Sequence, residues 1–150
     1  MPIANRLVAR KSERMLGLDV IRVGSVRETG DGRFRLDVLP ACRAGLDGLV
    51  PRTRVQVLDW MHELTHSDRR SLPVHPRGDE STAMRGVFSL RSPMRPNPIG
   101  VTEVDVLEVR DAGTVVVGLD ARDGSSLIAT HRHQGDVPFM DRTTRKGVVA

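Results

Sequence analysis

Between residues 91 and 100 the chain gathers polar side chains and prolines in a pattern that could hold a small ligand. The prolines fix φ at their own positions and push each preceding residue toward an extended conformation. The segment is therefore expected to be stiff, so its polar groups would lose little entropy on binding. Several side chains could donate hydrogen bonds to a carboxylate, a ribose or a base edge: Arg91, Ser92, Arg95 and Asn97. A loop that only joins two strands could have the same composition, so both interpretations stay open.

A second chemical pattern lies earlier in the chain, at His62-Glu63-x-x-His66. On a helix the two histidines would share a face and could bind zinc, while Glu63 activated a water molecule. The residues before the pattern have strand periodicity and those after it do not continue a helix, although His75 could be a third ligand. A zinc hydrolase therefore stays an alternative, and no metal is expected otherwise. His62 is also the candidate catalytic residue if the reaction needs a general base.

Short apolar segments surround these patterns and are expected to position them. Strands are predicted at residues 33–39, 54–60, 86–90, 101–109, 114–119 and 126–130. Within the second of these, Val55, Val57 and Asp59 share one face. Residues 43–50 could form one short helix, and residues 65–83 read as a long polar loop. Many short strands with turns between them predict a mainly β fold, either a compact barrel or a sandwich.

Length and composition predict one domain over residues 1–150, with 39% hydrophobic and 28% charged residues. The single cysteine, Cys42, excludes an intrachain disulfide and fits a reducing compartment. No early apolar run has the length of a signal peptide or a membrane span, so we expect a cytoplasmic protein without a membrane partner. Residues 1–14 are polar and basic, as in a loose arm or a first edge strand.

The net charge of +4 comes almost entirely from arginine, because Lys11 and Lys146 are the only lysines. Arginine suits planar contacts to phosphate and carboxylate, so an RNA or another anionic partner is plausible. A genome that prefers arginine to lysine would produce the same charge. Three Phe, one Trp and no Tyr leave few residues on which single-stranded RNA bases could stack.

Residues 86–100, Gly-Val-Phe-Ser-Leu-Arg-Ser-Pro-Met-Arg-Pro-Asn-Pro-Ile-Gly, resemble the signature of the TsaA/TrmO-like family. Members of that family carry Gly-Val-Phe-x-x-Arg-Ser-x-x-Arg-Pro-Asn-Pro-Ile-Gly. Residues 118–124 are similar to the family's Leu-Asp-x-x-Asp-Gly region, and residues 58–62 to a strand that ends in an aromatic-rich run and a histidine. Residues 45–49 resemble the Gly-Leu-Glu-Gly-Phe element that precedes this strand. The resemblance covers residues 33–128 and leaves residues 1–14 and 131–150 divergent or flexible.

The resemblance implies a compact TsaA-like β-barrel, usually a homodimer, that binds S-adenosylmethionine near the subunit contact. It also implies methylation of threonylcarbamoyladenosine next to the tRNA anticodon. The resemblance implies that the cofactor is surrounded by His62, Glu63, Arg91, Val101 and the turn at residues 120–124. Together with the donors of the proline-rich segment, the predicted cofactor-binding residues are His62, Glu63, Arg91, Ser92, Arg95, Asn97, Val101, Asp120, Asp123 and Gly124.

Two family elements are missing from this chain. A Pro-Arg-Gln-Pro-like element that contacts the cofactor is not found in residues 1–38, and residues 128–133 replace the Asp-Ile-Lys-Pro-Tyr that usually follows the turn. These departures keep three hypotheses open. The barrel could methylate tRNA, methylate a small molecule, or bind S-adenosylmethionine without catalysis.

Overall fold

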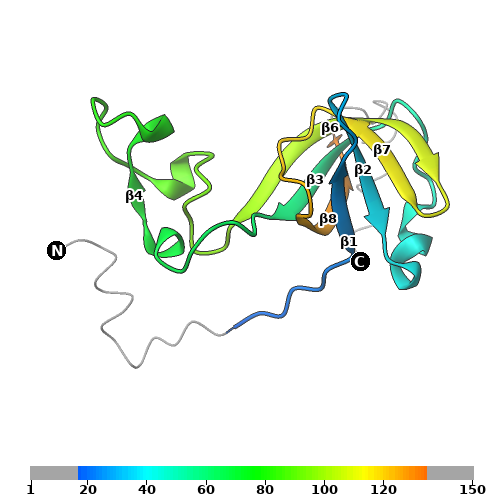
Figure 1. Cartoon of the computed structure of the whole chain (residues 1–150), viewed down its shortest axis with the longest axis horizontal. Coiled ribbons are helices and arrows are strands. Elements are labelled where there is room, and N and C mark those ends of the chain that lie inside the picture. Colours follow the sequence, from blue (N-terminus) through cyan, green and yellow to red (C-terminus); the bar gives the residue numbers. More distant parts are fainter. Residues whose placement is uncertain (1–16, 135–150) are drawn as a thin grey trace, which may run out of the picture.

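Six antiparallel strands close into a barrel in the computed structural model, which describes residues 17–134 (Figure 1). Around the barrel the order is β1-β2-β7-β6-β3-β8, and β8 pairs with β1 to complete the circle. The strands are β1 (Gly24–Glu28), β2 (Arg33–Val38), β3 (Arg54–Trp60), β6 (Ile99–Arg110), β7 (Gly113–Val117) and β8 (Ser126–Arg132). None of the helices within residues 17–134 has the length and apolar character needed to cross a membrane.

Alternation along the strands explains the barrel core. In β2 and β3 every second side chain is buried, so the strands predicted at residues 33–39 and 54–60 are confirmed. The strands predicted at 101–109, 114–119 and 126–130 are confirmed as β6, β7 and β8. The buried residues of this core are Val26, Phe34, Leu36, Val38, Val55, Val57, Val104, Val106, Val116, Leu119 and Leu127.

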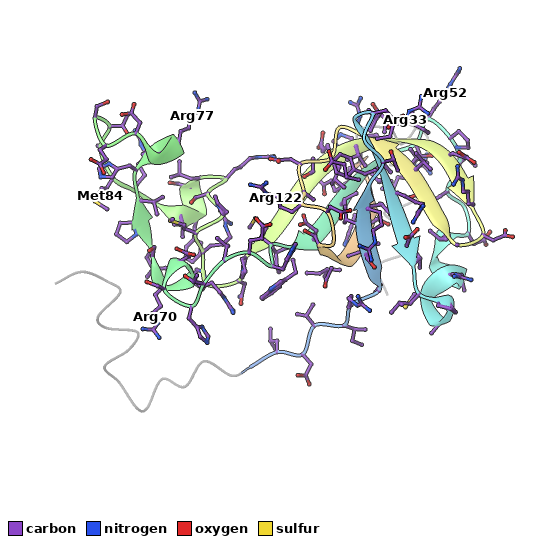
Figure 2. The ribbon with its side chains drawn as sticks, in the orientation of Figure 1. Arg33, Arg52, Arg70, Arg77, Met84 and Arg122 are labelled. Carbon is purple, nitrogen blue, oxygen red and sulfur yellow. The ribbon has the colours of Figure 1, made fainter. Side chains whose placement is uncertain are left out.

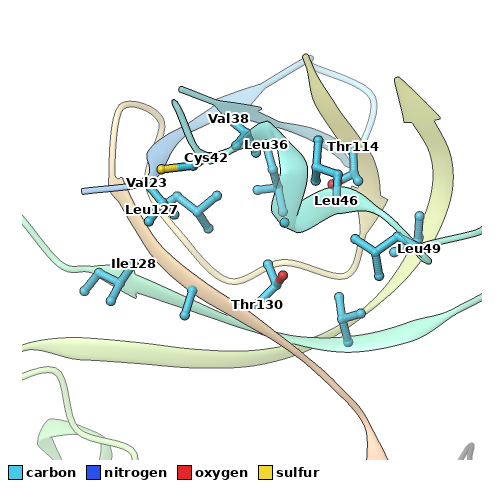
Figure 3. A pocket seen from close by; sticks show the side chains of 14 residues that line it. Val23, Leu36, Val38, Cys42, Leu46, Leu49, Thr114, Leu127, Ile128 and Thr130 are labelled. Atoms are coloured by element: carbon cyan, nitrogen blue, oxygen red, sulfur yellow. The ribbon is translucent and has the colours of Figure 1, made fainter. Parts of the chain in front are cut away.

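Two other elements differ from the sequence prediction. β1 was not predicted, because it is short and, of its side chains, only that of Val26 contributes to the apolar core. The helix expected at 43–50 is a 3-10 helix, η1 (Pro40–Leu46), which starts at a proline. η1 lies over one end of the barrel, above an apolar cavity of about 250 Å³ that Leu36, Cys42 and Leu127 help to line (Figure 3). The edge strand considered for residues 1–14 lies outside the described residues.

Residues 61–98, here called the arm, leave the barrel after β3 and return to it at β6 (green, Figure 1). The arm holds η2 (Asp68–Arg70), β4 (Pro73–Val74), η3 (Pro76–Gly78), β5 (Arg85–Gly86) and η4 (Val87–Ser89). The strand predicted at residues 86–90 is therefore wrong. β5 ends at Gly86, and the following residues turn into η4, which buries Val87. The long loop predicted at 65–83 is built of short turns and a two-residue strand.

Several contacts fix the base of the arm. Trp60, the last residue of β3, pairs in register with Ile99, the first residue of β6. The Met61 amide donates to the Pro98 carbonyl at 2.8 Å, which continues this pairing into the arm. The Arg69 guanidinium lies over the Trp60 ring, 5.2 Å from its centre, in cation–π geometry. The two ends of the arm are therefore held together where they meet the barrel.

Candidate functional site

A pocket of about 230 Å³ lies where the arm returns to the barrel. It is lined by Met61, Leu90, Arg91, Ser92, Arg95, Ile99, Gly100, Val101, Thr102 and Asp120. Half of the sequence-predicted cofactor residues meet here, namely Arg91, Ser92, Arg95, Val101 and Asp120. The pocket combines a cationic side chain, a carboxylate and apolar walls. Those groups suit a ligand that carries both charges on a partly apolar body.

Arg91 is the cationic group best placed to receive a ligand. Its side chain is exposed, and within the described residues it makes one long hydrogen bond, from NH1 to the Val101 carbonyl at 3.4 Å. That bond holds the guanidinium near the start of β6 while leaving it free to turn toward an anion. A carboxylate could accept two parallel hydrogen bonds from it.

Arg95 has a different task in the same loop. Its Nε donates to the Ser92 carbonyl at 2.7 Å, and its NH2 donates to the carbonyls of Val87 at 3.0 Å and Leu90 at 2.7 Å. Its guanidinium therefore gives hydrogen bonds to backbone carbonyls of the strand-free loop, and the Val87 carbonyl also accepts from the Leu90 amide at 3.2 Å. Arg95 lines the pocket, but its donors hold the pocket wall in shape. Cofactor contact by Arg95 remains a prediction.

The other predicted residues lie outside this pocket's lining. Asp123 accepts a hydrogen bond from the Glu28 amide at 2.9 Å, and the Gly124 amide donates to the Val26 carbonyl at 2.8 Å. These bonds fasten the turn between β7 and β8 to β1, and Gly124 supplies the positive φ of 84° that the turn requires. Glu63 forms an exposed ion pair with Arg122 at 3.4 Å, near the junction of arm and barrel (Figure 2). The side chain of Asn97 is exposed.

His62 lies next to a group of polar side chains that the sequence did not single out. Its Nδ1 is 3.3 Å from the Oγ of Ser125, which is 1% exposed. Asp59, at the end of β3, is equally buried, and neither of its carboxylate oxygens has a hydrogen-bond partner. The signal for Asp59 was present in the sequence, as an acidic residue on the apolar face of an alternating strand.

The Asp59 carboxyl is packed against the backbone of the pocket. Asp59 pairs in register with Gly100 of β6, and a Cβ added to Gly100 would come within 2.5 Å of Asp59 Oδ1. Burial raises the pKa of Asp59, and the nearby charge of Asp120 raises it further. The Ser125 hydroxyl and His62 lower this pKa.

The zinc alternative lacks the helix on which it depends. Residues 62–66 form turns, so the two histidines of the pattern do not share a helical face. Within residues 17–134 no three His, Cys, Asp or Glu side chains are grouped so that they could hold a metal ion.

Comparison with known proteins gives a consistent result. Residues 9–134 match the family model of the tRNA-methyltransferase O N-terminal domain. A probable S-adenosyl-L-methionine-binding protein of Methanocaldococcus jannaschii is 39% identical over 104 residues, which cover 69% of this chain and 82% of that protein. A mouse tRNA (adenine(37)-N6)-methyltransferase is 34% identical over 96 residues, or 64% of this chain and 22% of that protein.

The fold has a solved counterpart. The crystal structure of TrmO from Pseudomonas aeruginosa superposes with a TM-score of 0.60 at 22% identity, over 84% of this chain. The chain spans 58% of that structure. The family model covers most of the chain, and the archaeal relative is aligned over most of its own length. The chain therefore belongs to the tRNA-methyltransferase O N-terminal domain family, the TsaA/TrmO-like family that its sequence resembles.

Proposed function

We propose that this chain transfers a methyl group from S-adenosylmethionine to threonylcarbamoyladenosine next to the tRNA anticodon. Family membership confirms the predicted cofactor and the predicted S-adenosylmethionine-dependent methyltransferase activity. The observation that carries the proposal is the pocket at the base of the arm, because the family signature folds into its wall. The choice of tRNA as the acceptor follows the mouse relative, whose name gives it as a tRNA methyltransferase.

The residues of the pocket fit the cofactor. Arg91 would hold the amino-acid carboxylate, and Asp120 would accept hydrogen bonds from the ammonium group or from the ribose hydroxyls. Met61, Leu90 and Ile99 offer apolar contacts for the adenine ring. Once bound, the cofactor supplies an activated methyl on a positively charged sulfur. The chain then has mainly to align the acceptor with that methyl and to keep it aligned.

A second, larger groove on the arm offers the acceptor a route to the same place. This groove has a volume of about 770 Å³ and shares Leu90, Arg91 and Ser92 with the cofactor pocket. Its other side chains include Arg77, which can meet an anionic group. An acceptor lying in the groove would be separated from the cofactor only by this shared wall. The acceptor tRNA is charged and contains bases, so it suits a groove that carries Arg77 and adjoins the cofactor pocket.

The predicted homodimer is part of the proposal. The arm exposes three large apolar side chains, with Phe88 81%, Met84 54% and Met94 39% exposed. Met84 and Met94 also line the groove proposed for the acceptor, so Phe88 is the side chain left for a second copy to cover. A second copy of the chain is the proposed cover, and sedimentation analysis would measure it.

Two alternatives keep the same pocket. One is a methyltransferase whose acceptor is a small molecule, and the other is a barrel that binds S-adenosylmethionine without catalysis. The groove favours an enzyme over a sensor, because a sensor needs no second site beside the cofactor.

The test uses the whole chain with labelled S-adenosylmethionine. We expect calorimetry to detect cofactor binding, and label to move to bulk tRNA rather than to a small-molecule extract. Transfer to the extract alone would establish the small-molecule alternative, and binding without any transfer would establish the non-catalytic one. A protein that binds no cofactor and carries stoichiometric zinc would overturn the whole assignment.

Arg91→Ala sharpens the same experiment. Loss of a charged hydrogen bond to the cofactor is expected to weaken binding by about 1–3 kcal/mol. The matched control is Arg70→Ala, which removes an exposed arginine of the arm that does not line the pocket. An unchanged dissociation constant in Arg91→Ala would remove Arg91 from the site.

A further inference from the structure

We propose that His75 and Arg77 determine which acceptor binds, by recognising a hydroxyl group that lies next to an anionic group. Nε2 of His75 accepts a hydrogen bond from the hydroxyl, and the Arg77 guanidinium binds the anion. Both residues line the groove of about 770 Å³ on the arm. The inference rests on the proposed function, in which this groove receives the acceptor.

The His75 ring is held by a backbone carbonyl. Its Nδ1 lies 2.8 Å from the carbonyl oxygen of Thr82. A carbonyl can only accept a hydrogen bond, so Nδ1 carries a proton and donates it. In the neutral imidazole the second nitrogen, Nε2, then has no proton and can only accept. Nε2 has no hydrogen-bond partner among the described residues, so it can accept from a donor on a ligand.

A folded loop keeps the Thr82 carbonyl beside His75. The Thr82 amide and hydroxyl donate to the Asp79 carbonyl, at 3.1 and 2.7 Å. The amide and hydroxyl of Ser81 donate to the Asp79 carboxylate, at 2.9 and 2.6 Å. The Gly78 amide donates to the His75 carbonyl at 3.0 Å, which closes the loop at its other end. Thr82 does not line the groove and His75 does, so the ring edge that carries Nε2 is the one left to face the groove.

Arg77 lies two residues after His75, at a position that rarely holds an arginine. Its φ is 57°, in the left-handed region that glycine adopts most easily. Pro76 and Arg77 are the central residues of the turn that the Gly78 amide closes, and a positive φ at the second central position usually calls for glycine. Strained residues of this kind cluster at ligand sites. The arginine in this turn is therefore explained better by a use for its guanidinium than by the turn itself.

The Arg77 guanidinium is free to bind an anion. Its side chain is exposed, extends away from the arm in Figure 2, and makes no hydrogen bond or ion pair within residues 17–134. Arg69 and Arg95, by contrast, donate to backbone carbonyls of the arm. Among the described residues that line the groove, Arg77 and Arg91 outnumber the one carboxylate, Glu80. The charge of the groove therefore favours an anionic ligand.

A hydrogen-bond acceptor and a cation two residues apart suit a ligand with a hydroxyl donor beside an anion. The proposed acceptor offers this combination in two places. In RNA, each ribose 2′-hydroxyl lies beside a phosphate, and DNA lacks this hydroxyl. In the threonylcarbamoyl group, the threonine hydroxyl lies beside a carboxylate. The experiment below distinguishes these two sources.

Fluorescence anisotropy with anticodon stem-loops, in the absence of cofactor, tests the inference. Three probes are compared, namely an RNA that carries threonylcarbamoyladenosine, the same RNA without the modification, and the corresponding unmodified DNA. His75→Ala should weaken binding of the modified RNA about three- to tenfold, because one hydrogen bond is lost. Arg77→Gly should weaken it about tenfold or more, because the lost hydrogen bond is charged. Glycine adopts the positive φ of this turn without strain, so we expect Arg77→Gly to fold and to keep its stability in urea.

His66→Ala and Arg85→Ala are the matched controls, because both side chains are exposed on the arm and neither lines the groove. Each control should bind the modified RNA as the wild type does. Losses in the two controls that equal those in His75→Ala and Arg77→Gly would overturn the proposal, as would no loss in any variant.

The three probes identify the source of the hydroxyl. If His75→Ala weakens binding of both RNAs by the same factor and leaves DNA binding unchanged, the ribose and its phosphate are bound. A loss confined to the modified RNA assigns the site to the threonine group. An equal loss for RNA and DNA would overturn the hydroxyl assignment.

Nitrogen-15 NMR of histidine-labelled protein checks the His75 ring in the free protein. The chain has five histidines, so a His75→Gln spectrum assigns the relevant signals. Near pH 8 we expect Nδ1 to be protonated and Nε2 to be bare, whereas free histidine in water prefers its proton on Nε2. A proton on Nε2 of His75 in the free protein would overturn the proposal.

Methyl transfer separates this inference from the proposed function. With labelled S-adenosylmethionine and bulk tRNA, His75→Ala is expected to raise KM for tRNA and to leave cofactor affinity unchanged. If RNA affinity depends on both residues but no methyl reaches tRNA, the proposed function fails and the inference stands. If tRNA is methylated and both variants match the wild type in RNA affinity and in KM, the inference fails and the proposed function stands.

Discussion

The barrel and the arm are stabilised by different interactions. The barrel buries a continuous apolar core, and each of its strands is paired on both sides. Within the arm, few side chains are fully buried, and short 3-10 turns, a two-residue strand pair and the carbonyl bonds of Arg95 hold the chain. Stability therefore resides in the barrel, while the surfaces for ligands lie on the arm and along its junction with the barrel.

Core truncation gives the largest expected contrast between the two regions. Leu36→Ala removes a buried side chain from β2, and we expect a loss of about 2–5 kcal/mol in the free energy of unfolding. Phe88→Ala removes a larger side chain from the arm, but this side chain is 81% exposed, so the change should stay within about 0.5 kcal/mol. Urea denaturation of both variants measures the difference. Equal losses would mean that the arm shares the barrel's core.

Gly100→Ala probes the junction itself. The added Cβ would meet Asp59 Oδ1 at 2.5 Å inside a packed wall, so we expect a cost of about 1–3 kcal/mol in unfolding free energy. The same substitution in an Asp59→Ala background should cost clearly less, because the clashing carboxyl is gone. A cost that does not depend on residue 59 would place the strain elsewhere.

Two carboxyls, Asp59 in the barrel and Asp79 in the arm, are expected to make stability depend on pH with opposite signs. The pKa of Asp59 is raised by burial, so the folded state binds its proton more tightly than the unfolded state does. Its contribution to stability is present below the unfolded pKa and is lost as the pH rises through the folded pKa. Asp59→Asn should therefore gain stability relative to the wild type as the pH rises from about 4 to about 8, in urea titrations.

Asp79 in the arm provides the contrast. A hydrogen bond from the Ser81 hydroxyl lowers its pKa, so its contribution is lost as the pH falls. Asp79→Asn should accordingly lose stability relative to the wild type only above the carboxyl's folded pKa, and by little, because the side chain is exposed. The same sign in both variants would contradict the burial argument for Asp59.

Arg95→Ala is expected to have the smallest global effect. It removes three hydrogen bonds within the arm, yet unfolding free energy should change by no more than about 0.5 kcal/mol, because the arm can open locally. Hydrogen exchange should speed up at the Leu90 amide and stay unchanged in β2. Arg85→Ala, an exposed arginine of β5, is the control. Faster exchange throughout the barrel would show that the two regions unfold together.

Sequence reasoning was most successful where one rule governed the structure. Alternation in β2 and β3 predicted both the strands and their buried faces, since a strand places successive side chains on opposite sides. It missed β1, whose few residues contribute one side chain to the core. It also mistook residues 86–90 for a strand, because composition alone does not show that only Gly86 of these five residues pairs with another strand.

Part of the candidate site could also be predicted from the sequence, and part could not. The residues around Arg91 could be predicted because they are contiguous and stiffened by prolines. Asp59, Ser125 and His62 could not be grouped, because closure of the barrel brings the β7–β8 turn beside the end of β3. Asp123 and Gly124 were assigned to the cofactor through the family resemblance, and their hydrogen bonds to β1 give them a structural role as well.

The register match between Trp60 and Ile99 has an evolutionary consequence. In the barrel, the whole arm occupies the place of a hairpin turn, since β3 and β6 are neighbours that would pair without it. The entropy of closing a loop grows only slowly with its length, so residues can be added to or removed from such an insertion at little cost to the scaffold. Descendants of one barrel could thus exchange their acceptor specificity by remodelling the insertion while inheriting the barrel unchanged.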